Sequence, residues 1–216
     1  MELQTLRDAE RYLDGLINRE KKTQYDYERL GLAPIRALLA AIGNPERGLR
    51  CLHVAGSKGQ GTVTLVAEHL LRAAGKSVGA YTSPHLVSWR ERFRIDGAPV
   101  GEAALVAALR AMQPEIERLR QDPELCPSFF DVSTALALAL FRDAAVDFAA
   151  IEVGLGGRLD STNAIESSVS IVTTIQLEHT DKLGDTLEAI AREKAGIFRA
   201  GVPALHGELD PEAWGA

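Results

Sequence analysis

Apolar residues recur every three or four positions in two early parts of the chain, residues 5–17 and residues 33–42. This spacing predicts two amphipathic helices, and Gly43-Asn44-Pro45 is expected to end the second one. The pattern then changes, because residues 51–55 form a short, mostly apolar run that stops at Gly56. Such a run is typical of a strand buried on both faces of a parallel sheet.

The remaining chain alternates between these two patterns. A helix with the apolar stripe Val63, Val66 and Leu70 is expected directly after the first strand. Further strands are expected at residues 78–82, 148–153, 169–175 and 202–205, and further helices at residues 101–119, 129–142 and 186–195. Residues 83–100 show little helical period and are expected to form a long connection.

Strands that alternate with helices indicate an α/β fold, in which a parallel sheet is covered by helices on both faces. With 216 residues, the chain is expected to form a single domain. We divide it into an N-terminal helical segment, residues 1–48, and an α/β core, residues 49–216.

Composition and charge narrow the classes of partner. The chain carries 24 Lys and Arg residues against 30 Asp and Glu residues, and its net charge of −6 argues against a nucleic-acid binder. Its longest apolar runs, such as residues 135–141, are far shorter than the roughly 20 residues that a membrane-spanning helix needs. The first residues show no secretory signal, and two cysteines are too few for a disulfide framework. We therefore expect a cytoplasmic protein that binds neither nucleic acid nor membrane.

Polar features stand at the ends of four different predicted strands. They are the glycine-rich loop GSKGQGT at residues 56–62, Ser83, Glu152 and His179. The carboxyl ends of parallel strands lie at one edge of a sheet, and ligands bind outside that edge. We therefore expect these four features to gather at one site.

Two interpretations of the glycine loop are open. A strand, a loop with Gly56, Gly59 and Gly61, and a helix is the arrangement that places backbone N–H groups around a phosphate. The strict pattern GxxxxGK[ST] is absent, however, because Gln60 stands where the phosphate-binding lysine would be. A tight turn between strand and helix is the alternative.

The other polar residues also have structural alternatives. Glu152 ends an apolar strand, where a buried carboxylate must be compensated by a metal ion or by hydrogen bonds from the glycines that follow it. His179 has acidic neighbours that could orient its ring, or it is a hydrogen-bonded loop residue. Ser83 could be a turn residue before Pro84, and Lys194 could lie on a solvated helix face.

Four motifs carry a resemblance to a known family. They are HVAGSKGQGT at residues 53–62, YTSPHL at 81–86, EVGLGGRLDSTN at 152–163 and EHTDKLGDTLEAIAREKAGI at 178–197. Together they resemble the folylpolyglutamate synthases and dihydrofolate synthases, ATP-dependent amide ligases related to the Mur ligases. The stretch from Leu16 to Pro45 is similar to the family too. SPHL and EVGLGGRLD argue against a Mur-type cell-wall ligase, and the resemblance implies a P-loop-type Mur ligase central domain for residues 49–216.

The resemblance also implies a reaction and its partners. In the family, a carboxylate of dihydropteroate or of a tetrahydrofolate polyglutamate attacks the γ-phosphate of ATP to give an acyl phosphate. The amine of L-glutamate then displaces phosphate and forms the amide. Mg²⁺ is the implied cofactor, because it neutralises phosphate charge during phosphoryl transfer.

Particular residues correspond to family positions. Ser83 and Glu152 match the ligands of one metal ion, His179 matches a ligand of a second, and Lys194 matches a lysine that is carbamylated to supply oxygen ligands. Glu152, His179 and Lys194 are thereby the implied catalytic residues. The implied ATP-binding residues are Gly56, Ser57, Lys58, Gly59, Gln60, Gly61 and Thr62. The implied substrate-binding residues are Ser128, Phe129, Phe130, Asp131, Leu159, Asp160 and Ser161, in which one of the phenylalanines offers an aromatic face.

The sequence also departs from the family. The family loop reads GTNGKGS, so Gln60 replaces its lysine and a lysine stands instead at position 58, while the family pair Asp-His is Glu178-His179 here. Family members carry a C-terminal ligase domain that we do not expect in this chain. Two hypotheses follow. The chain is an ATP-binding part of a folate-type amide ligase, inactive alone and with a complementary C-terminal chain as its expected partner, or it is a non-catalytic nucleotide-binding module.

Overall fold

A computed structural model describes residues 2–20, 27, 30–207 and 210–214; the rest, including parts of the family-like stretch from Leu16 to Pro45, lies outside the described residues. The helices are α1 (Leu6–Asp14), α2 (Ala33–Ala41), α3 (Gln60–Ala73), α4 (Glu102–Leu119), α5 (Phe129–Asp143), α6 (Thr180–Leu183), α7 (Leu187–Ala195) and α8 (Pro211–Trp214). The strands are β1 (Cys51–Ala55), β2 (Val78–Tyr81), β3 (Phe93–Ile95), β4 (Ala98–Pro99), β5 (Phe148–Glu152), β6 (Ser167–Val172) and β7 (Ala204–His206). In the described ranges, no helix combines the length and apolarity that crossing a membrane requires.

The strands form one mixed sheet in the order β4-β3-β2-β5-β1-β6-β7. Five neighbouring strands of this order run parallel, as the alternating pattern predicts; they are β2, β5, β1, β6 and β7. Strands β3 and β4 are antiparallel and lie within the segment expected to be a plain connection. Asp96 and Gly97 join them, both with positive φ, as a two-residue hairpin turn requires. The Asp-Gly pair was the signal for this hairpin, and the helical-period analysis of residues 83–100 missed it.

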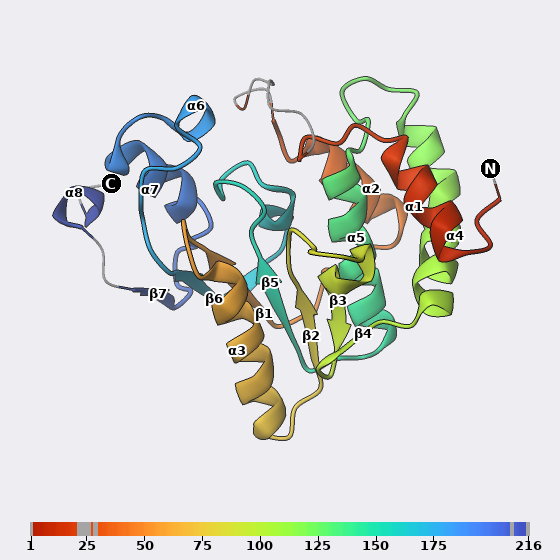
Figure 1. Cartoon of the computed structure of the whole chain (residues 1–216), viewed down its shortest axis with the longest axis horizontal. Helices are drawn as coiled ribbons and strands as arrows, with labels where there is room; N and C mark the ends of the chain where they lie inside the picture. The colour runs from red at the N-terminus through yellow and green to blue at the C-terminus, as the bar shows by residue number, and fades with distance from the viewer. Residues whose placement is uncertain (1, 21–26, 28–29, 208–209, 215–216) are drawn as a thin grey trace.

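Helices cover the sheet unequally. Helix α5 packs against the sheet on one face and is buried on nearly every side, because α2 and α4 pack over it. Leu13 of α1 and Leu38 of α2 belong to the same apolar core as α4 and α5, so the N-terminal helices share the core of the α/β part. Figure 1 shows these helices gathered beyond β2 and β3, while α7 and α8 lie near β6 and β7.

Helix α3 lies on the opposite face, over β5, β2 and β1. Its predicted apolar stripe does not face the sheet, because Val66 and Leu70 are 50% and 63% exposed. The helix buries Thr64 and Glu68 instead. Glu68 is buried because it accepts hydrogen bonds from Arg94 and from the Gly97 N–H, both in the hairpin that the sequence analysis missed. Helices therefore lie on both faces of the sheet, as expected, although the predicted apolar stripe of α3 is turned away from it.

The carboxyl ends of the parallel strands carry the polar features, as expected. The glycine loop follows β1, Ser83 follows β2, Glu152 is the last residue of β5, and His179 follows β6. Since these four strands are parallel neighbours, their carboxyl ends meet at one edge of the sheet. This edge therefore holds the candidate site.

Candidate functional site

The glycine loop turns tightly between β1 and α3. A side chain at Gly56 would overlap the Thr173 hydroxyl, so the loop can lie this close to the residues after β6 only with glycine there. Gly59 has φ of 80°, a left-handed conformation that favours glycine, and α3 begins at the next residue. The sequence therefore shapes the loop at two separate positions.

The start of the loop is anchored, and its end is open. The Ser57 N–H donates to the Thr174 carbonyl (2.8 Å), and the Thr173 hydroxyl donates to the Lys58 carbonyl (2.7 Å). Among the described residues, no acceptor meets the backbone N–H groups that open α3, those of Gln60, Gly61 and Thr62. Free N–H groups at a helix N-terminus attract anions. The loop thus has the form of an anion cradle, which favours the first of its two interpretations.

Glu152 lies against this cradle and is only 4% exposed. Its carboxylate accepts a hydrogen bond from the Ser83 N–H (2.9 Å), and a Cβ added at Gly61 would lie 3.1 Å from it. Burial raises the pKa of Glu152 to about 7, although hydrogen bonds from Ser83 and from the Gln60 side chain lower it in part. The glycines after β5 do not compensate this carboxylate, so the structural alternative given for it is wrong.

The donor set is compatible with magnesium bound together with phosphate. No group of three or more His, Cys, Asp or Glu side chains in the described part of the chain could enclose a metal ion. Mg²⁺, however, commonly uses one or two carboxylates and completes its coordination with water and substrate phosphates. Glu152 is a buried carboxylate with few donors beside free N–H groups, and the Ser83 hydroxyl belongs to the same corner. These two residues suit such an ion.

Lys194 is buried beneath the glycine loop at 2% exposure, so a solvated helix face is the wrong interpretation. Its ammonium donates to the Gly56 carbonyl (2.9 Å) and pairs with Glu178 (2.8 Å). In this state the ammonium is a hydrogen-bond donor, and it fastens the loop to α7. His179 is exposed, has a left-handed backbone with φ of 44°, and lines the cavity described next.

A cavity of about 1010 Å³ opens beside this edge. Ser83 and His179 line one part of it, and the segments around residues 17–20, 123–131 and 154–161 line the rest. Of the seven implied substrate-binding residues, six line this cavity: Ser128, Phe130, Asp131, Leu159, Asp160 and Ser161. The structure thus brings together Ser83 and His179, the residues implied as metal ligands, and most of the implied substrate-binding residues, which are far apart in the sequence.

The two phenylalanines at the start of α5 have different surroundings. Phe130 lines the cavity, whereas Phe129 is buried, with the Arg92 guanidinium 5.2 Å from its ring centre. Phe130 is therefore the aromatic face that the cavity offers, and Phe129 is a core residue.

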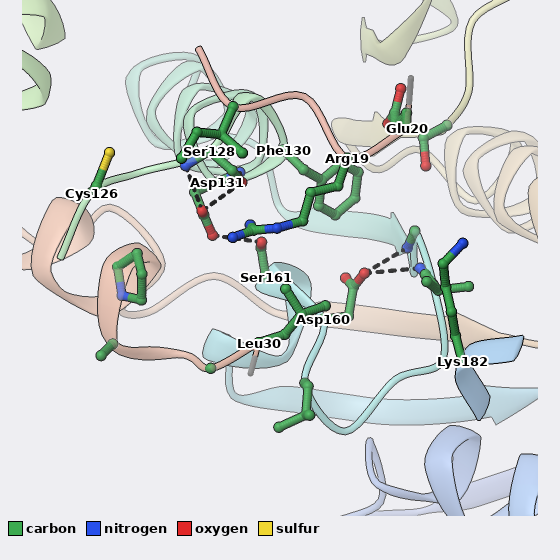
Figure 2. A pocket seen from close by; sticks show the side chains of 18 of the residues that line it. Arg19, Glu20, Leu30, Cys126, Ser128, Phe130, Asp131, Asp160, Ser161 and Lys182 are labelled. Carbon is green, nitrogen blue, oxygen red and sulfur yellow. Dashed lines mark hydrogen bonds between the residues drawn. The ribbon is translucent and has the colours of Figure 1, made fainter. Parts of the chain in front are cut away.

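A hydrogen-bonded network makes one polar wall of the cavity (Figure 2). Asp131 accepts from the N–H and the hydroxyl of Ser128 and, through its other oxygen, from the Ser161 hydroxyl (2.7 Å). The Ser128–Asp131 pair caps the N-terminus of α5, so the helix start and the loop after β5 are fixed to each other. Asp131 is thereby an oriented carboxylate at the cavity surface.

The hydrogen bonds of Asp160 indicate mainly a structural role. It is buried, and its carboxylate accepts from the N–H groups of Gly154 and Leu155 and from the N–H and hydroxyl of Thr162. Figure 2 shows Asp160 turned toward these loop amides. The Thr162 hydroxyl is in turn 2.8 Å from Nε2 of the buried His53. Asp160 thus closes the GLGGRLD loop on itself.

Arg92, which was not among the residues singled out in the sequence, is fully buried near the cavity. Its guanidinium makes a two-point ion pair with Glu20 (2.8 and 2.6 Å) and donates to His85 Nδ1 (2.9 Å). Glu20 lines the cavity, so Arg92 joins the N-terminal segment to the loop after β2. The sequence carries no local signal for this burial, because successive side chains of an extended segment point to opposite faces and an arginine beside Phe93 is ordinarily exposed.

Known proteins resemble this chain in sequence and in fold. A Bacillus subtilis dihydrofolate synthase/folylpolyglutamate synthase is 39% identical over 184 residues, which cover 85% of this chain and 43% of that protein. The chain is homologous to these synthases. A solved FPGS–AMPPCP–folate complex is 38% identical with a TM-score of 0.88, covering 98% of this chain and 50% of the other. Escherichia coli FolC in complex with DHPP and ADP is 39% identical with a TM-score of 0.84, covering 96% and 47%. No protein-family model matches the chain.

The comparisons confirm the family resemblance drawn from the four motifs, and they confirm the α/β fold. The chain spans less than half the length of the Bacillus subtilis synthase and about half of the solved FPGS chain. Both solved synthases hold a nucleotide or its analogue, so these relatives bind nucleotides.

Proposed function

We propose that this chain is the ATP-binding part of a ligase that adds L-glutamate to dihydropteroate or to a folylpolyglutamate through an acyl phosphate. One observation carries the proposal. The anion cradle at α3 and the cavity of about 1010 Å³ share a corner, where Ser83 lines the cavity and donates its N–H to Glu152 beside Gly61. A nucleotide in the cradle and an acid in the cavity would meet there.

The nucleotide side is supported by the free N–H groups of Gln60, Gly61 and Thr62. They are placed to bind phosphate oxygens, and the solved relatives with AMPPCP or ADP agree with this use. Glu152 and Ser83 would hold Mg²⁺, which supplies charge neutralisation to the phosphates when bound. Lys194 keeps the loop in place through the Gly56 carbonyl.

The acid side is supported by the cavity walls. Phe130 offers an aromatic face for a flat ring, and Asp131 offers a fixed carboxylate that can accept hydrogen bonds from ring N–H groups. The solved relatives hold folate or DHPP. An oriented ring would leave the carboxylate end of such a molecule free to reach the corner beside Ser83.

The proposed chemistry has two balanced steps. A carboxylate oxygen of the substrate bonds to the γ-phosphorus of ATP, and ADP leaves. The amine nitrogen of glutamate then bonds to the acyl carbon, inorganic phosphate leaves, and the nitrogen loses its proton. The residues of this chain hold the phosphates and the acid in attack geometry, which converts an encounter of two molecules into a reaction within one complex.

A non-catalytic nucleotide-binding module is the second candidate, and one observation favours it. Gln60 stands at the position of the family lysine, and its side chain is a hydrogen-bond partner of Glu152. A neutral amide gives phosphate less stabilisation than an ammonium. This candidate retains nucleotide binding and predicts no turnover even when a second domain is supplied.

Titration calorimetry and thermal unfolding with Mg-ATP test the nucleotide site. We expect binding to raise the melting temperature of the parent chain by mass action. Glu152→Ala should abolish that shift. Glu188→Ala, which removes an exposed carboxylate that pairs with Arg192, should leave the shift intact. An equal shift in Glu152→Ala and the parent would mean that the proposed site is wrong.

Glutamate-dependent phosphate release from ATP, with dihydropteroate or tetrahydrofolate present, tests the ligase proposal. The isolated chain should bind Mg-ATP without steady turnover, because the acyl phosphate needs shielding from water by a closing domain. Turnover that is lost in Glu152→Ala would refute the expectation that this chain is inactive alone. Failure to bind Mg-ATP or dihydropteroate would refute the proposed function itself.

A further inference from the structure

A histidine is buried in the middle of the sheet, outside both the anion cradle and the cavity. His53 belongs to β1, which lies between β5 and β6, and it is 1% exposed. A buried polar side chain normally has a hydrogen-bond partner. The partner of His53 is the hydroxyl of Thr162, which lies 2.8 Å from Nε2 in the segment after β5. This contact joins a central strand to the loop that lines the cavity.

The hydrogen bonds of Thr162 determine which ring nitrogen of His53 carries a proton. A hydroxyl has a single hydrogen to donate, and the Thr162 hydroxyl donates it to Asp160 over 2.5 Å. Asp160 also accepts from three backbone N–H groups, so it is an ionised carboxylate that cannot donate in return. The contact with Thr162 must therefore use a hydrogen on Nε2. Burial, with the Arg199 charge as a smaller cause, lowers the pKa of His53 to about 3, so at neutral pH Nδ1 carries no proton.

The other neutral form of the ring would reverse this arrangement. With its hydrogen on Nδ1, His53 would present Nε2 as an acceptor and would take the hydroxyl hydrogen of Thr162. Asp160 would then lose the shortest of its four hydrogen bonds and would face the lone pairs of the Thr162 oxygen instead. Hydrogen bonds to a carboxylate are among the strong ones, so this loss is costly. A donor at the position of Nε2 therefore keeps the hydroxyl directed to Asp160.

This chain of hydrogen bonds ends at the cavity wall. The second carboxylate oxygen of Asp160 accepts from the N–H groups of Gly154 (3.2 Å) and Leu155 (2.9 Å), and both of these residues line the cavity. Ser161, the next residue after Asp160, lines the cavity too, and Figure 2 shows the two residues on neighbouring parts of the wall. The wall that the loop after β5 provides is therefore held by bonds that begin at His53.

We propose that His53 is a positioning residue for the cavity: its Nε2–H directs the Thr162 hydroxyl to Asp160 and so holds the loop after β5 in the shape of the cavity wall. His53 does not line the cavity, so it acts through these two side chains. A loop that is held less firmly adopts several shapes, and a ligand that fits one of them binds more weakly. The proposal rests on the proposed function only for the identity of this ligand, an acid such as dihydropteroate.

Two donor-removing variants break the chain of hydrogen bonds at different ends. His53→Leu replaces the ring by an apolar side chain, and Thr162→Val replaces the hydroxyl by a methyl group of similar shape. His53→Gln is the conservative variant, because the amide nitrogen of glutamine is as many bonds from Cα as Nε2 and also donates. Ser170→Ala is the matched control. Ser170 is buried beside His53 in register on β6, and its hydroxyl donates to the Ile197 carbonyl instead.

Amide hydrogen exchange, measured by NMR, tests the positioning without any ligand. In the parent chain, hydrogen bonds to Asp160 should protect the N–H groups of Gly154 and Leu155. Each donor-removing variant should speed their exchange by about tenfold or more. Combining both changes should add little, because the two side chains act in one chain of hydrogen bonds. The conservative variant and the control should exchange like the parent, and the ring nitrogen shifts of His53 should place its proton on Nε2.

Titration calorimetry with dihydropteroate measures the consequence for the cavity. The two donor-removing variants should bind it about tenfold more weakly or worse, because the wall is no longer held in one shape. His53→Gln and Ser170→Ala should stay within about threefold of the parent. Mg-ATP affinity should be unchanged in all four variants, since the chain of hydrogen bonds leads away from the anion cradle. A general loss of folding would instead weaken both ligands together.

The outcomes separate the role of His53 from the proposed function. Parent-like exchange of Gly154 and Leu155 in both donor-removing variants would overturn the proposal. Faster exchange in His53→Gln or in Ser170→Ala would overturn it too, because the effect would then not depend on the donor. A parent chain that does not bind dihydropteroate would refute the proposed function, and the exchange rates would still decide whether His53 holds the loop.

Discussion

Two glycine-containing loops follow neighbouring parallel strands, yet they differ in whether their backbone N–H groups have hydrogen-bond acceptors. The loop after β1, residues 56–62, leaves the N–H groups at the start of α3 without acceptors among the described residues. The loop after β5, residues 154–160, gives the N–H groups of Gly154 and Leu155 to its own Asp160. The first loop is open to an anion, and the second is already filled by one.

The difference shows what glycine spacing can and cannot indicate. Glycine permits the close approaches that both loops need, at Gly56 against Thr173 and at Gly154 against Phe130. The position of the nearby carboxylate determines whether the loop N–H groups are occupied. Asp160 lies inside the second loop and accepts from its N–H groups, whereas Glu152 lies outside the first loop and does not. A glycine loop without an internal acidic residue is therefore the better candidate for phosphate.

Removing the carboxylate of Asp160 from the second loop should have the largest effect, a loss of stability. Asp160→Ala leaves two loop N–H groups and the Thr162 N–H without their acceptor in a buried place, while the Thr162 hydroxyl keeps its contact with His53 Nε2. We expect a loss of about 4 kcal/mol in the free energy of unfolding, measured by urea denaturation. Ser161→Ala, which removes one hydrogen bond to Asp131, is the control at about 1 kcal/mol. Equal losses would show that the loop does not depend on Asp160.

Glu152 should make stability depend on pH. Burial raises its pKa to about 7 from an ordinary 4.5, so between these values the folded chain holds a proton that the unfolded chain has released. The free energy of unfolding should therefore fall as pH rises from about 4.5 to 7, by about 3 kcal/mol. Glu152→Gln should flatten this part of the profile. A profile of Glu152→Gln that matches the parent would remove Glu152 as the cause. The measurement is denaturation without Mg²⁺ across this range.

Gln60→Lys should increase the affinity of the first loop, residues 56–62, for phosphate. A charge-assisted hydrogen bond contributes roughly 1.5–3 kcal/mol, so ATP affinity should rise about tenfold to a hundredfold in calorimetry. Gln60→Met, which is neutral and of similar length, controls for loss of the hydrogen bond to Glu152. An equal rise in Gln60→Met would assign the effect to freeing Glu152 rather than to the added charge.

Lys58→Ala should have the smallest effect. Lys58 is exposed, and its backbone is held by Thr173 and Thr174, so the side chain adds only a solvated charge near the loop. We expect ATP affinity to fall about fivefold or less, near 1 kcal/mol, with Lys76→Ala unchanged. A loss of a hundredfold would instead make Lys58 the functional replacement for the family lysine.

Much of the fold could be predicted because local patterns encode it. Strand β1 and helix α2 match their predicted bounds within a residue, since a short apolar run and a helical period need no distant partner. The hairpin at Asp96-Gly97 was also encoded locally and was overlooked. The exposure of Val66 and Leu70 was not encoded locally, because it depends on which side of α3 the hairpin and its ion pair occupy.

The sequence by itself determined the strand ends and hence the gathering of the glycine loop, Ser83, Glu152 and His179 at one edge, since parallel strands align their carboxyl ends. Tertiary structure alone decided what each side chain does there. Phe130 faces the cavity while Phe129 packs under Arg92, and Asp160 serves its own loop. The physical reason is that burial and hydrogen-bond partners come from segments distant in sequence, as when Arg92 joins Glu20 to His85.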